Sequence, residues 1–152
     1  MQIIAHRGCP TLFLENTRNS FLKAIELNYD MIELDVQITK DNQLVVFHDD
    51  NLERLTLSQS TKKINDLNYE ELLNTPLLDG SIIPLLKDIL DEMDQQIAFN
   101  LEIKTTSVGI QLSDMIKDRK PYAPYLISSF LMMELNAFKT RNPNIPLAWL
   151  TP

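Results

Sequence analysis

The sequence predicts an α/β fold built on a parallel sheet. Short apolar or β-branched runs alternate with segments of helical period, which is the pattern of βαβ units. The runs are almost continuously hydrophobic, as expected for strands that are buried on both faces. The chain has 152 residues, 44% of them hydrophobic and 23% charged, which suits one domain with a sizeable core.

Six apolar runs have the length and composition of strands. They are Gln2–His6, Met31–Gln37, Gln43–His48, Ile97–Ile103, Tyr125–Phe130 and Pro146–Leu150. Residues 49–83 are less regular, and we expect them to form a long connection with a short helix rather than a domain boundary.

The first helix has recognisable signals at both ends. Asn16 or Thr17 can cap its start, because either side chain can accept a hydrogen bond from the first turn. Asn28 is expected to end it, because Asn tolerates the left-handed conformation that follows a helix. The other predicted helices are a segment starting at Pro84 and the segments 69–73, 108–119 and 131–141.

Charge and cysteine content restrict the class of protein. The formal charge is −7 and no run of Lys or Arg occurs, which argues against nucleic acid as a partner. Cys9 is the one cysteine, and the first residues contain no stretch that resembles a signal peptide, so we expect a cytoplasmic protein. No apolar run approaches the roughly 20 residues that span a bilayer.

The polar residues within the predicted strands lie near the strands' C-terminal ends. They are His6, Glu33, Asp35, His48 and Glu102, with Lys104 directly after the fourth strand. In parallel α/β folds, catalytic groups collect at that end of the sheet. The sequence therefore predicts a functional site there.

Side-chain alternation gathers three carboxylates at this site. Glu33 and Asp35 project from one face of their strand, and Glu102 can join them from another. A hard divalent cation with oxygen ligands balances such a charge better than Lys104 alone. The alternatives are a strand whose charges face water and an internal ion-pair cluster.

The chain's two histidines, His6 and His48, each end a predicted strand. Imidazoles can serve as a general acid and a general base near neutral pH, and the alternative is that they bind zinc. Arg7 is suited to a phosphate or a carboxylate, or to a surface salt bridge. We expect Cys9 to be a packing residue beside the site.

These motifs resemble those of the glycerophosphodiester phosphodiesterase family, in its order and spacing, from residue 3 to about residue 150. The matching segments are His6-Arg7-Gly8, Glu15-Asn16-Thr17, Ile32-Glu33-Leu34-Asp35-Val36, Val45-Val46-x-His48-Asp49 with Arg54, Ile83-Pro84-Leu85, Leu101-Glu102-Ile103-Lys104 and Ser128-Ser129-Phe130. The resemblance implies a TIM-type (β/α)8 barrel. It also implies metal-dependent hydrolysis of glycerophosphodiesters to sn-glycerol 3-phosphate and an alcohol.

The resemblance also implies roles for individual residues. His6 and His48 resemble the family's acid/base pair, and Arg7 and Lys104 resemble its phosphate-facing cations. The ligands of a Mg²⁺ or Ca²⁺ ion correspond to Glu33, Asp35 and Glu102. The mechanism often proposed for the family has the glycerol 2-hydroxyl attack phosphorus, after which water opens the cyclic phosphate.

The sequence departs from the family pattern at its C-terminal end. The tryptophan-threonine and threonine-aspartate pairs of the family's last two strands do not occur after the sixth predicted strand. We therefore expect residues 1–152 to form one domain with about six of eight βα units, the N-terminal three quarters of the family domain. Such an incomplete barrel would self-associate through its open edges.

Two other functions compete with glycerophosphodiester hydrolysis. One is a phospholipase D-like activity on lysophospholipids, which needs an apolar groove that the sequence does not locate. The other is a catalytically silent domain that binds a ligand or a partner chain.

Overall fold

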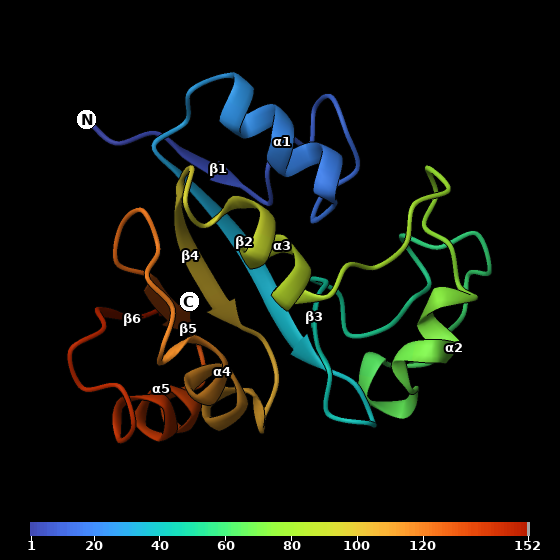
Figure 1. The fold of residues 1–152 in the computed structure, drawn as a ribbon. Coiled ribbons are helices and arrows are strands. Elements are labelled where there is room, and N and C mark those ends of the chain that lie inside the picture. The colour runs from blue at the N-terminus through green and yellow to red at the C-terminus, as the bar shows by residue number, and fades with distance from the viewer. Residues whose placement is uncertain (152) are drawn as a thin grey trace.

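The computed structural model describes residues 1–151 and contains a curved six-stranded sheet with helices packed on it (Figure 1). The strands are β1 (Ile4–His6), β2 (Met31–Ile38), β3 (Leu44–Val46), β4 (Ala98–Ile103), β5 (Leu126–Ser129) and β6 (Leu147–Trp149). Five of them are parallel neighbours in the order β1-β2-β4-β5-β6. The predicted α/β class and all six predicted strands are therefore confirmed.

The orientation of β3 differs from the parallel sheet that the sequence predicts. β3 pairs with the end of β2 in the antiparallel sense and lies off the main strand path. Only residues 39–43 connect the two strands, whereas a parallel crossover needs about a dozen residues or more. The wall of the open barrel thus consists of five parallel strands among the described residues, and β3 forms a hairpin at its rim.

The helices follow the predicted pattern. They are α1 (Arg18–Glu26), α2 (Tyr69–Leu73), α3 (Leu86–Met93), α4 (Val108–Ile116) and α5 (Met132–Lys139). Helix α2 has the predicted bounds, the others are shorter, and α3 begins at Leu86 rather than at Pro84. Thr17 caps α1 by accepting a hydrogen bond from the Ser20 backbone N–H at 3.3 Å. Asn28 has a φ of 57° directly after the helix, as predicted. No helix among residues 1–151 is long and apolar enough to cross a membrane.

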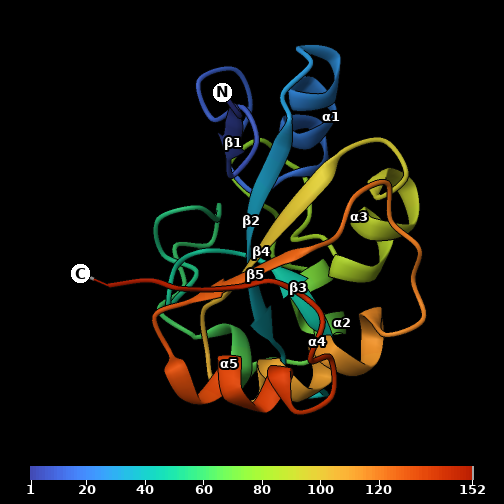
Figure 2. The same cartoon turned by 90° about the vertical axis from the view of Figure 1, so that its left-hand side faces the viewer.

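One apolar cluster holds the helices to the sheet. Ile32, Leu34 and Leu101 project from one face of β2 and β4 and are fully buried. Phe21 of α1, Leu90 of α3 and other residues of α4 and α5 belong to the same cluster. Figure 2 shows α1, α3 and α4 along one side of the sheet. The opposite sheet face is left for polar residues.

The 49–83 connection has a core of its own. Its cluster includes Leu52, Leu55, Ile64 and Leu72, together with Val45 of β3 and Phe47, the residue after β3. Gln37 of β2 donates hydrogen bonds to the backbone carbonyls of Phe47 and Asp49, at 2.9 and 2.8 Å. The connection is therefore attached at the C-terminal end of β2, where the predicted site lies.

Candidate active site

The strand register aligns the predicted site residues across the sheet. His6 is the register partner of Glu33, and Asp35 is that of Glu102. Register partners on neighbouring strands project from the same face. This face is opposite to the one that carries Ile32 and Leu34, as side-chain alternation predicts.

The three carboxylates form a compact, buried group. One oxygen from each of Glu33, Asp35 and Glu102 lies within 4.8 Å of the others, and the residues are 5%, 1% and 9% exposed. At that separation and an effective dielectric near 20, each pair of ionised carboxylates costs roughly 3 kcal/mol. Burial, with the charges of Asp35 and Glu102, raises the pKa of Glu33 to about 8. The group therefore lacks positive charge.

Two carboxylate oxygens of the group fit a cation. Among residues 1–151, buried Glu33 Oε1 and Asp35 Oδ1 have no hydrogen-bond partner. Lys104 offsets part of the negative charge of the carboxylates, because its Nζ lies 2.9 Å from Glu102 Oε1 and 3.6 Å from Asp35 Oδ1. Unpartnered buried carboxylate oxygens are costly, and an all-oxygen set suits a hard divalent cation such as Mg²⁺ or Ca²⁺.

The loop after β1 fixes the position of Asp35. Arg7 Nε lies 3.2 Å from Asp35 Oδ2, and Asn16 Nδ2 donates to the same oxygen at 2.8 Å. Both residues adopt positive φ, 58° in each case, so the loop accepts a strained backbone to direct them inward. Gly8, with a φ of 85°, lies so close to Ser20 that any side chain there would collide with it.

The two histidines lie in different surroundings. The His6 side chain is 67% exposed, and its Nε2 lies 3.8 Å from Glu33 Oε2. His48 is less exposed, and its Nδ1 lies 2.7 Å from Asp49 Oδ1. His48 and Lys104 line one surface hollow of about 420 Å³. Lys104 of this hollow also contacts two of the three carboxylates, Asp35 and Glu102.

The structure thus brings the predicted residues to one end of the sheet. Arg7, Lys104 and His6 contact the carboxylate group directly, whereas His48 adjoins it through the shared hollow. Neither histidine belongs to the group of Glu33, Asp35 and Glu102, which offers oxygen ligands only. A second group of possible ligands contains His48 with Glu15 and Asp49, whose ligand atoms also lie within 4.8 Å of one another, so the acid/base and zinc-ligand interpretations of His48 both stay predictions.

Sequence reasoning assigned four residues no role in the site. They are Glu15, Asn16, Asp49 and Arg54, which bind one another or the predicted residues. Each belongs to a quoted family motif, and an Asp directly after a strand-end histidine is a signal for an imidazole partner. The periodicity of the chain contains no such signal for Arg54, because it lies in the irregular connection.

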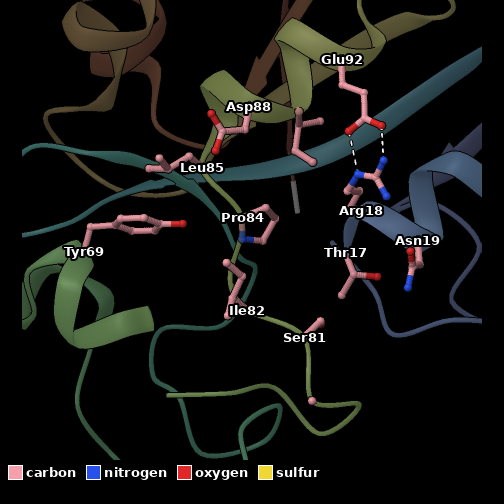
Figure 3. A pocket seen from close by; sticks show the side chains of 12 residues that line it. Thr17, Arg18, Asn19, Tyr69, Ser81, Ile82, Pro84, Leu85, Asp88 and Glu92 are labelled. Carbon is pink, nitrogen blue, oxygen red and sulfur yellow. Dashed lines mark hydrogen bonds and ion pairs between the residues drawn. The ribbon is translucent and has the colours of Figure 1, made fainter. Parts of the chain in front are cut away.

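A separate apolar groove lies outside this site. Its volume is about 430 Å³, and Ile82, Pro84, Leu85 and Ile89 line it. Figure 3 shows the ion pair between Arg18 and Glu92 at one side of the groove. None of the predicted catalytic residues lines it.

Comparison with known proteins identifies the family. Residues 6–151 match the profile of the glycerophosphoryl diester phosphodiesterase family. The chain is 35% identical to a glycerophosphodiester phosphodiesterase of Bacillus altitudinis, over 99% of this chain and 66% of that protein. It is 38% identical to lysophospholipase D GDPD1 of Rattus norvegicus, over 77% of this chain and 41% of that protein.

A solved structure shows the same fold. The Oleispira antarctica phosphodiesterase OLEI02445, in complex with the product sn-glycerol-3-phosphate, aligns with a TM-score of 0.87 and 28% identity. The alignment covers 98% of this chain and 65% of that one, so the chain spans just under two thirds of such relatives. Given the strand-end carboxylates and histidines and a match over nearly its whole length, the chain belongs to the glycerophosphoryl diester phosphodiesterase family.

Proposed function

We propose that this chain hydrolyses glycerophosphodiesters to sn-glycerol 3-phosphate and an alcohol, with a divalent cation as cofactor. The carboxylate group of Glu33, Asp35 and Glu102, with its two unpartnered buried oxygens, is the observation that carries the proposal. Family membership supports the reaction class, and the Oleispira antarctica relative in complex with sn-glycerol-3-phosphate supports the product.

Glu33, Asp35 and Glu102 would hold a Mg²⁺ or Ca²⁺ ion. When bound, the ion supplies positive charge for a phosphodiester oxygen and for the charge that develops in the transition state. Lys104 adds a cation at the same place, since its Nζ already contacts two of the ligands. Arg7 holds Asp35 and Glu15, and its guanidinium extends the positive surface that receives the phosphate.

The two histidines move the protons of the reaction. The glycerol 2-hydroxyl attacks phosphorus and gives its proton to one imidazole, while the other imidazole protonates the departing alcohol oxygen as its bond to phosphorus breaks. In the second step water attacks the cyclic phosphate and the histidines exchange roles, which yields sn-glycerol 3-phosphate and restores both protonation states. His6 is suited to such a role because it lies beside Glu33, and His48 because it shares a hollow with Lys104, which contacts Asp35 and Glu102.

A single assay tests this proposal. The purified chain is incubated with glycerophosphocholine in Mg²⁺, in Ca²⁺ and after exhaustive chelation, and released glycerol 3-phosphate is followed by phosphorus NMR. We expect turnover with a divalent cation and its loss after chelation. Full turnover in the chelated sample would contradict the metal-dependent mechanism, and no turnover in any sample would favour a catalytically silent domain.

Lysophospholipids are the second candidate substrates. The resemblance to a lysophospholipase D and the apolar groove lined by Ile82, Leu85 and Ile89 favour this alternative. A parallel assay with lysophosphatidylcholine separates the two, because only the lysophospholipid has an acyl chain to bury. A higher kcat/KM for lysophosphatidylcholine, lowered by Ile82→Asp at an exposed position of the groove, would support the alternative.

The cytoplasmic location remains part of the proposal. The thiol of Cys9 is free and buried, which supports a reducing compartment, and burial raises its pKa. Detecting the labelled protein in separated cell fractions tests this proposal, which requires the protein in the cytoplasmic fraction.

A further inference from the structure

A chain of ion pairs connects His48 to the loop that holds the carboxylate group. Arg54 donates two hydrogen bonds to Asp49, from Nε to Oδ2 at 2.6 Å and from Nη2 to Oδ1 at 2.7 Å. It donates two more to Glu15, at 3.1 and 2.7 Å. Glu15 in turn accepts a hydrogen bond from Arg7 at 3.0 Å. Residues 15 and 54 come from different connections, so Arg54 fastens one to the other.

Arg54 keeps Asp49 ionised. Its hydrogen bonds, together with that of His48, lower the pKa of Asp49 to about 2 despite partial burial. Burial alone would raise the pKa of Glu15, but the hydrogen bonds and charges of Arg54 and Arg7 lower it instead. Both carboxyl groups therefore accept hydrogen bonds and donate none at neutral pH.

An ionised Asp49 determines which imidazole nitrogen holds the proton. Asp49 Oδ1 lies 2.7 Å from His48 Nδ1, and a carboxylate there requires an N–H at that nitrogen. Neutral His48 then has its free electron pair at Nε2. The other charged groups around His48 are Asp50 and Lys104, which line the same hollow, and Glu15.

We propose that Arg54, anchored by Glu15, is a positioning residue that fixes Asp49 against His48 Nδ1 and so reserves His48 Nε2 for proton exchange with the substrate. Without Arg54, the carboxylates of Glu15 and Asp49 lie close together beside His48 with no guanidinium between them. Their repulsion releases Asp49 from its geometry, and the imidazole then samples both tautomers. The proposal rests on the proposed acid/base role of His48, whereas the tautomer itself does not depend on catalysis.

The tautomer can be measured directly because the chain has only two histidines. Long-range proton–nitrogen NMR spectra of nitrogen-labelled protein report the protonated ring nitrogen, and His6→Gln assigns the signals. We expect the Nδ1–H form for His48 in the unsubstituted chain and a mixture of tautomers in Arg54→Gln. The matched control is Arg141→Gln, because Arg141 also pairs with an aspartate through two hydrogen bonds and is similarly exposed, at 48% against 51% for Arg54.

Kinetics provide the second measurement. In Arg54→Gln we expect kcat to fall about tenfold or more, part of the 10²- to 10⁴-fold that general acid–base catalysis contributes, with little change in KM. The pH profile should shift as His48 loses its fixed partner, and Arg54→Lys should restore part of kcat by returning the charge. If Arg54→Gln does not fold by circular dichroism, Glu15→Gln and Asp49→Asn are measured in its place.

The outcomes separate this inference from the proposed function. An unchanged His48 tautomer in folded Arg54→Gln, or in both replacement variants, overturns the inference whatever the activity. A changed tautomer in a chain without phosphodiesterase activity supports the positioning role and contradicts the proposed function. A fall in kcat without any change in tautomer also overturns it, because Arg54 would then act only through general stability.

Discussion

At the scale of single residues, the roles proposed for His6 and His48 differ from those proposed for the carboxylates. The proposed metal ligands are oxygens, so His6→Ala and His48→Ala should each lower turnover by about 10²- to 10⁴-fold and leave metal affinity largely intact. Calorimetric titration with Mg²⁺ or Ca²⁺ measures the metal affinity, and steady-state kinetics measure the turnover. Cys9→Ser is the control and should keep a near-normal rate. Loss of metal affinity in either histidine variant would restore the zinc-ligand alternative.

We predict that Glu33 makes the stability of the metal-free protein depend on pH. Its folded-state pKa of about 8 lies above the ordinary value of 4.5, so the folded state holds the proton more tightly than the unfolded state. The contribution of Glu33 to the free energy of unfolding, on the order of a few kcal/mol, is complete below about pH 4.5. It is lost as the pH rises towards 8. Urea unfolding in chelator at pH 6 and pH 8.5 should show the lower midpoint at pH 8.5.

Two comparisons isolate Glu33 as the cause. Glu33→Gln should remove most of the difference between the two pH values, whereas Glu26→Gln, at an exposed position in α1, should retain it. Saturating divalent cation should also reduce the difference, because the ion takes the place of the proton. Equal midpoints at both pH values in the unsubstituted chain would show that Glu33 is ionised in the folded state.

How much of the site the sequence predicts depends on the kind of contact. The shared face of Glu33, Asp35 and Glu102 follows from strand alternation, a rule with a fixed period. The clamp of Arg54 on Asp49 and Glu15 joins segments 39 residues apart through an irregular connection, and no periodicity describes it. Long-range side-chain pairs in loops are determined by the tertiary fold alone.

At the scale of elements, Asn28 shows how one backbone angle ends a helix. With its φ of 57°, it adopts a conformation that costs most residues with a side chain about 1–2 kcal/mol. Asn28→Ala should therefore lower the free energy of unfolding by about 1 kcal/mol, and Asn28→Gly should lower it little or raise it. Denaturant unfolding measures both.

The same substitution elsewhere supplies the control for Asn28. Asn136 is exposed within α5, where Ala is the better helix former, so Asn136→Ala should leave stability unchanged or raise it. Equal effects at the two positions would mean that the left-handed conformation of Asn28 contributes nothing.

The elements themselves were predictable to different degrees. The caps at Thr17 and Asn28 and the six apolar runs identify helices and strands, because local chemistry determines them. The direction of β3 was missed, because an apolar run is the same in either orientation. The short connection at 39–43 does indicate that β3 runs antiparallel to β2, because it permits a hairpin and is too short for a parallel crossover.

At the scale of the whole molecule, the open sheet leaves two strand edges without a partner. Among residues 1–151, β1 pairs only with β2, and β6 pairs only with β5. Ile4 is 45% exposed and Trp149 is 59% exposed at these edges. Unpaired backbone groups beside exposed apolar side chains favour pairing with another chain.

We therefore predict that this 152-residue chain self-associates as its concentration rises. Sedimentation velocity or light scattering over a dilution series should show species larger than the monomer. Ile4→Lys and Trp149→Lys should each reduce the association, because a charge at an edge opposes strand addition. Leu57→Lys should not, because Leu57 is equally exposed, at 60%, but lies in the 49–83 connection away from both edges.

We also predict that the associated form is more active than the monomer, because the free edge of β1 lies next to the candidate site. His6 is the last residue of β1, and its register partner Glu33 belongs to the carboxylate group. Stabilising the free edge of β1 should therefore hold His6 more firmly beside that group, and specific activity should rise with concentration. A monomer at every concentration, with constant specific activity, would show that β2 alone positions β1 and that the five parallel strands need no further partner.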